Sequence, residues 1–63
     1  MRTGELKRIL SKGGCYIIRH GGNHDIWYSP KTGKQFSVER HDSKEIATGT
    51  ANGILKDAGL KRK

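Results

Sequence analysis

The chain is nearly free of cysteine, and this limits both its covalent structure and its metal chemistry. Cys15 is the one cysteine among 63 residues. An internal disulfide is therefore impossible, and a zinc site built on several cysteines is excluded. A small chain without a disulfide fits a reducing compartment better than secretion. We expect Cys15 to be a buried, small apolar residue, since free cysteine is usually buried and unreactive.

Long apolar runs are also missing. The longest, residues 15–18, is far too short to cross a bilayer, which takes about 20 residues. No apolar stretch near the N-terminus is typical of a signal peptide. We therefore expect a soluble, cytoplasmic protein that does not bind a membrane.

Acidic residues are scarce relative to basic ones. Thirteen Lys and Arg oppose six Asp and Glu, which gives a formal charge of +7. Such a charge on a small body favours a polyanionic partner: nucleic acid, an anionic membrane surface or an acidic protein. Nucleic acid is the leading interpretation because basic side chains bind phosphates. A role in solubility alone stays open.

The length permits one domain with a thin core. A chain of this size buries only ~60% of the surface that it exposes when unfolded. A separate cofactor domain does not fit, and we expect no cofactor. Any chemistry is therefore expected at the surface.

Hydrophobic patterning predicts five elements. Apolar residues at helical spacing indicate a first helix over about 3–13, with Thr3 as a candidate cap and glycines 13–14 as its end. β-Branched and aromatic residues predict three strands, separated by Gly-rich and Pro-containing turns. A second helix is predicted over about 50–58, capped by Thr48 or Thr50 and ended by Gly59, and a basic tail follows. The predicted strands are residues 15–20, 24–29 and 34–40.

Short loops make the three strands an antiparallel meander. Two helices on one face of this sheet would bury both apolar stripes. The predicted fold class is therefore α+β, in the order α-β-β-β-α, which is the order of the double-stranded RNA-binding domain. Within the second strand, alternation places Trp27 with Asp25 on one face and Tyr28 with Ile26 on the other. Trp27 is expected in the core.

Three histidines carry the candidate chemistry: His20, His24 and His41. Their spacings of four and seventeen residues, on or near loops, do not favour a metal site, and none is predicted. A single histidine can instead cleave RNA. It takes the proton from a 2′-hydroxyl, whose oxygen attacks the adjacent phosphorus, while cations stabilise the charge that develops. DNA lacks that hydroxyl.

His24 is the best candidate for this chemistry. Two glycines and Asn23 precede it, so a phosphate or sugar could approach the backbone closely. The residues alone leave a second interpretation open, in which His24 is only a turn residue. His20 is expected to be a solvated edge residue, and His41 either contacts phosphate or has a structural role. Basic residues on the neighbouring strands and turn could hold phosphates: Arg19, Lys31, Lys34 and Arg40.

Several segments together resemble the HicA family, the small mRNA interferases of bacterial HicAB toxin–antitoxin systems. They are, in chain order, "TGELKRILSKGG", "GGNHDIWYSP", "KQFSVERH" and "TGTANGILKDAGL". The resemblance runs nearly end to end, so residues 1–63 are expected to form a single HicA-like toxin domain. Family members commonly have serine at the position of Asn23 and proline at that of Glu39. Glu39 adds a negative charge near the expected phosphate path.

The resemblance implies a metal-independent endoribonuclease that cleaves mRNA, arrests translation and is neutralised by a HicB-type antitoxin. It also implies that His24 is the catalytic histidine. The residues expected to bind RNA are Gly22, Asn23, Arg19, Lys34, Arg40 and His41. Two alternatives remain: a double-stranded-RNA-binding module that does not cleave, and a protein that binds only an acidic protein partner.

Overall fold

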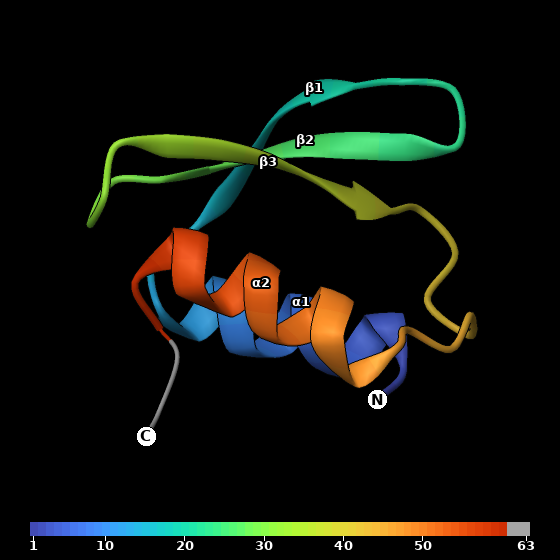
Figure 1. Ribbon diagram of the computed structural model, residues 1–63. Coiled ribbons are helices and arrows are strands. Elements are labelled where there is room, and N and C mark those ends of the chain that lie inside the picture. The colour runs from blue at the N-terminus through green and yellow to red at the C-terminus, as the bar shows by residue number, and fades with distance from the viewer. Residues whose placement is uncertain (61–63) are drawn as a thin grey trace.

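The computed structural model describes residues 1–60 and has two layers, a sheet and a pair of helices (Figure 1). Lys61–Lys63 of the predicted basic tail lie outside the described residues. The elements, in chain order, are α1 (Thr3–Lys12), β1 (Tyr16–His20), β2 (His24–Ser29), β3 (Lys34–Glu39) and α2 (Thr48–Ala58). Both helices cover the same face of the sheet. The predicted α+β class and its α-β-β-β-α order are confirmed.

The sheet is an antiparallel meander in the order β1-β2-β3. In β2, Asp25, Trp27 and Ser29 are buried, whereas Ile26 and Tyr28 between them are half-buried. The Ser29 hydroxyl donates a hydrogen bond to the Ala58 carbonyl oxygen of α2 (2.8 Å), so the buried face is the one that the helices cover. His24, at the start of the strand, therefore belongs to the opposite, open face.

A register shift between Ile17 and Arg19 marks a bulge in β1. Ile17 lies opposite Trp27, and Arg19 lies opposite Ile26, which leaves Ile18 without a partner. A bulge of this kind bends a strand and increases its twist. The β1–β2 end of the sheet extends beyond the helices (Figure 1). Ile17 and Ile18, at the bulge, are exposed.

The core lies between the sheet and both helices. Leu6 and Leu10 of α1 are fully buried, as is Val38 of β3. Trp27 and Cys15 are also buried, as predicted from the sequence. The remaining buried apolar residues are Phe36, Ile46, Ala51, Leu55 and Ala58.

α1 begins at Thr3, as predicted, but the predicted side-chain caps are wrong for both helices. α1 has Arg2 at its N-cap position with no side-chain cap, and Thr3 is buried with its hydroxyl donating to the Lys44 carbonyl oxygen (2.8 Å). Thr3 thus ties α1 to the segment before α2. α2 begins at Thr48, and its N-cap residue, Ala47, also provides no side-chain cap. The glycine ends are as expected, because Gly59 at the C-cap of α2 has a left-handed φ of 75°.

No helix within residues 1–60 is long and apolar enough to span a bilayer.

Candidate active site

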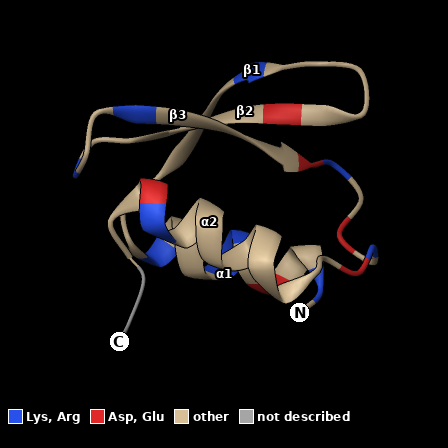
Figure 2. Cartoon of the chain, in the orientation of Figure 1, with Lys and Arg blue, Asp and Glu red and all other residues tan. Residues whose placement is uncertain are grey.

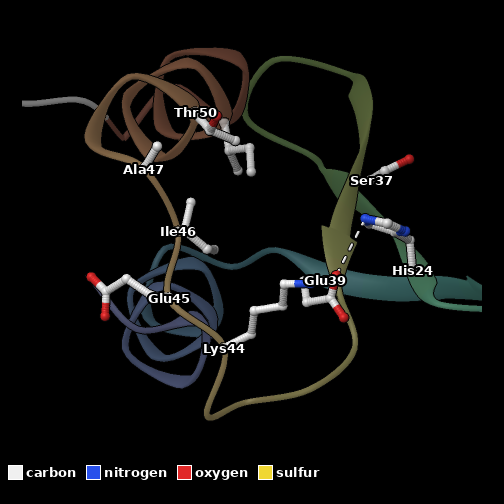
Figure 3. Close-up of a pocket in the computed structure, with 9 residues that line it drawn as sticks. His24, Ser37, Glu39, Lys44, Glu45, Ile46, Ala47 and Thr50 are labelled. Carbon is white, nitrogen blue, oxygen red and sulfur yellow. Dashed lines mark ion pairs between the residues drawn. The ribbon is translucent and has the colours of Figure 1, made fainter.

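His24 begins β2 on the open face of the sheet. Its side chain is 56% exposed, so a large substrate can reach the imidazole without a cleft. Glu39 of β3 is its cross-strand partner, and the Nε2 atom of His24 lies 3.5 Å from Oε1 of Glu39 (Figure 3). The two side chains form an ion pair whenever the imidazole is protonated. Glu39 therefore lies next to the imidazole. The sequence had indicated only that its charge would lie near the phosphate path.

The turn before His24 requires a glycine at position 21. The Gly21 N–H donates to the His24 carbonyl oxygen (2.9 Å), and a Cβ on Gly21 would lie 2.6 Å from that oxygen. A Cβ on Gly22 would meet nothing within 4 Å. Gly21 thus lets the hairpin close, and the position of a Cβ on Gly22 is open space.

Arg40 binds this turn from β3. Its Nη1 atom donates to the Gly22 carbonyl oxygen (3.2 Å), and its backbone N–H donates to the Asn23 carbonyl oxygen (3.1 Å). Its Nη2 atom lies 3.5 Å from Oδ1 of Asp25. The structure therefore brings together four of the residues singled out in the sequence: Gly22, Asn23, His24 and Arg40.

Asp25 is a buried carboxylate that sequence reasoning missed as part of the site. The His20 Nδ1–H donates a hydrogen bond to its Oδ1 atom (2.9 Å), and its side chain is 5% exposed. The His20 hydrogen bond lowers the pKa of Asp25, and the nearby charge of Arg40 lowers it further, against the opposing effect of burial. His20 is a solvated edge residue, as expected, but it also helps to keep Asp25 ionised next to Arg40.

We predict that Asp25 makes the fold sensitive to acid. A carboxyl whose pKa is lowered by folding stabilises the folded state above its unfolded pKa of ~3.9, and the effect is lost as the pH falls through the folded value. Asp25→Asn is therefore less stable than the wild type at pH 7, and the difference closes below about pH 4.

Denaturation followed by Trp27 fluorescence at stepwise pH measures this difference. Asp57→Asn is the matched control, because the Asp57 side chain makes no recorded hydrogen bond or ion pair within residues 1–60. A gap between Asp25→Asn and wild type that stays constant down to pH 3 would contradict the role given to Asp25.

The other predicted RNA-binding residues are more dispersed. Arg19 lies opposite Ile26, on the neighbouring strand and two residue pairs along from His24. Lys34 lies opposite Ser29, at the far end of β2, ~17 Å from His24 at ~3.4 Å per residue. His41 is exposed and directly follows Arg40. The structure thus does not bring Lys34 to the imidazole.

The loop after β3 is held against α1. The Lys7 ammonium donates to the Arg40 carbonyl oxygen (2.7 Å) and pairs with Asp42 (2.8 Å). These contacts hold the backbone of Arg40 and His41 in place against α1. Figure 2 shows Lys and Arg spread over the helices, the sheet and the loops, with no single element carrying most of them.

A hollow of about 230 Å³ opens next to His24 (Figure 3). It lies between β3 and the segment that leads into α2. No sequence signal indicated it, because its walls come from parts of the chain that are far apart in sequence. Its lining residues are His24, Ser37, Glu39, Lys44, Glu45, Ile46, Ala47, Thr50 and Ile54.

Within residues 1–60, no three side chains of His, Cys, Asp or Glu gather as a metal site would require.

The arrangement defines a class of protein. It is a small α+β domain with the architecture of the double-stranded RNA-binding domain, and the open face of its sheet carries an exposed histidine.

Comparison with protein families identifies the group within this class. A family model described as the HicA toxin of bacterial toxin-antitoxin matches residues 4–60. The match covers nearly the whole chain, so the chain belongs to the HicA toxin family. Comparisons with curated proteins and with solved structures gave no match.

Proposed function

We propose that this HicA-family chain is a metal-independent endoribonuclease, an mRNA interferase that acts in the cytoplasm and arrests translation. The observation that carries the proposal is the exposed His24 imidazole beside the turn that Arg40 holds. Membership of a toxin family supports it, because destroying mRNA is a direct way to stop growth.

His24 supplies the acid–base chemistry. Its neutral imidazole takes the proton from a 2′-hydroxyl, and the 2′-oxygen attacks the adjacent phosphorus. The bond from phosphorus to the 5′-oxygen of the next nucleotide breaks, and that oxygen takes a proton from solvent water as it leaves. The products are a 2′,3′-cyclic phosphate and a 5′-hydroxyl. No metal is needed to provide the nucleophile, because the substrate already carries it. Such acid–base catalysis contributes about 10²–10⁴-fold to a rate.

Arg40 is the leading candidate to stabilise the charge on the phosphoryl oxygens. Its guanidinium is held by the Gly22 carbonyl oxygen and lies near Asp25, which fixes its position at low entropic cost. A guanidinium has five N–H donors, and these contacts leave some of them for a phosphate. Asn23, Arg19 and His41 are further candidates, since all three are exposed.

The α-β-β-β-α architecture supports a second function, a double-stranded-RNA-binding module without catalysis. That module would bind duplex RNA and leave it intact, and replacing His24 would not change its effect on cells. The exposed imidazole favours cleavage over this alternative.

The toxin family also supports a protein partner. We infer that a HicB-type antitoxin binds this chain and covers the face that carries His24. The purified antitoxin should then block both RNA cleavage and access of RNA to the imidazole.

Product chemistry tests the proposed reaction. The purified chain is incubated with single-stranded RNA in the presence of EDTA, and the new ends are identified. We expect cleavage with 2′,3′-cyclic phosphate and 5′-hydroxyl ends. Products with 5′-phosphate ends, or a reaction that EDTA abolishes, would contradict attack by the 2′-hydroxyl without a metal.

A further inference from the structure

The hollow next to His24 has the size of a site for a single heterocycle. Its volume of about 230 Å³ is below the ~300–1,000 Å³ of pockets for drug-sized ligands. Ile46 is buried at its wall, and Ile54 of α2 is half-buried there. Apolar side chains of this kind can hold the faces of an unstacked base. Because His24 lines the same hollow, a base bound there would belong to a nucleotide next to the scissile phosphate.

Glu39 gives the hollow its polar character. Its side chain is 13% exposed, yet its only recorded contact within residues 1–60 is the 3.5 Å approach of His24, and no donor forms a hydrogen bond to it there. Its carboxylate oxygens keep contact with the solvent in the hollow and accept no hydrogen bond from residues 1–60. Its two oxygens are therefore acceptors suited to a ligand that brings N–H donors.

Lys44 lines the same hollow and has the opposite chemistry. Its ammonium group has three donors and no acceptor, whereas the carboxylate of Glu39 only accepts. A ligand that suits both must present adjacent donors and an acceptor. The guanine edge does so, with N1–H and the 2-amino group as donors and O6 as acceptor.

Resting on the proposed nuclease function, we propose that this hollow binds the guanine base of a nucleotide adjacent to the cleaved phosphate. Glu39 accepts hydrogen bonds from N1–H and the 2-amino group of the base, and Lys44 donates to O6. Adenine and cytosine place an acceptor beside their amino group, which would face a carboxylate oxygen. Uracil flanks its single N3–H with two carbonyl oxygens and is disfavoured for the same reason.

Oligonucleotides that differ at one base test this site. Each is a single-stranded RNA with a single guanosine in an otherwise guanosine-free sequence, compared with the same RNA carrying inosine, which lacks the 2-amino group, or adenosine. We expect wild type to cleave next to guanosine at least about tenfold more efficiently than next to inosine or adenosine, because a good bidentate contact gives discrimination of this order. In Glu39→Gln, one acceptor becomes a donor, and the preference should fall to less than about twofold.

The ratio between the oligonucleotides is the readout, because Glu39 lies next to His24 and its replacement can change the overall rate. Glu5→Gln is the matched control, since Glu5 lies in the first turn of α1, away from the hollow, and should keep the wild-type ratio. Equal cleavage of guanosine and inosine RNA by wild type would overturn the guanine site and leave the nuclease function in place. A preference that survives in Glu39→Gln would do the same.

Binding measurements test the guanine site independently of RNA cleavage. The dissociation constants of the same oligonucleotides are measured with His24→Ala in two forms, with Glu39 intact and with Glu39→Gln. If wild type does not cleave RNA but His24→Ala prefers guanosine through Glu39, the nuclease proposal fails and the guanine site stands. Binding without any preference among the bases overturns the guanine site, whether or not the wild type cleaves.

Discussion

Replacing His24 with alanine is expected to lower the rate of RNA cleavage by about 10²–10⁴-fold, the range that general acid–base catalysis supplies. The fold should survive, because the His24 side chain is 56% exposed and contributes nothing to the apolar core. The measurement is the single-turnover cleavage rate of purified variants, with Trp27 fluorescence as the check on folding. In cells, inducible expression should arrest growth for wild type and not for His24→Ala.

A second histidine gives the control for that result. His20 binds Asp25 from the helix-covered side of the sheet, and its replacement by asparagine keeps a donor near the position of Nδ1. His20→Asn should retain activity within a few-fold of wild type. Equal growth arrest by wild type and His24→Ala would show that His24 is not the catalytic group.

Leu10→Ala is expected to have the largest effect on stability. Leu10 is fully buried in the core, and truncating a buried leucine typically costs about 2–5 kcal/mol. A domain of 63 residues has a free energy of unfolding of roughly 3–9 kcal/mol at ~0.05–0.15 kcal/mol per residue. The variant should therefore lose about a fifth or more of its stability.

Urea denaturation followed by Trp27 fluorescence measures this loss. Ile18→Ala is the matched control, because Ile18 is exposed at the bulge of β1 and its truncation should change the stability by less than about 0.5 kcal/mol. A loss below 1 kcal/mol for Leu10→Ala would mean that the packing between α1 and the sheet contributes little to stability.

The fold could be predicted because its determinants are local. Alternation in β2 correctly assigned Trp27 to the core and Tyr28 to the other face, and short loops fixed the meander. The predicted helix caps were wrong, and for Thr3 the reason is a tertiary contact. The hydroxyl of Thr3 binds the carbonyl oxygen of Lys44, 41 residues away, instead of capping its own helix.

Only the part of the site around His24 and Arg40 could be predicted from the sequence. The turn before His24 and the end of β3 meet through the Arg40 contacts, as their order suggested. Sequence spacing could not show that Gly21 closes the turn, since this depends on the distance from its Cβ position to the His24 carbonyl oxygen. The hollow could not be predicted from the sequence either, because Ser37 and Thr50 come together there only through the packing of β3 and α2.

The structure changes the role expected of Glu39. In the sequence it was a departure from the family pattern that added negative charge near the phosphate path. In the structure it is largely withdrawn from solvent, lies opposite His24 and lines the hollow. Its negative charge therefore acts mainly on the imidazole and on a ligand in the hollow, and less on a phosphate in solvent.

The most direct test of the central claim compares two substrates and two proteins. One RNA is entirely ribonucleotide, and the other has a single 2′-deoxynucleotide on the 5′ side of the main cleavage site. The account predicts that wild type, in EDTA, cleaves the first at that site and leaves the second intact there, and that His24→Ala cleaves neither at a comparable rate. Cleavage at the 2′-deoxy position, or undiminished cleavage by His24→Ala, would contradict it.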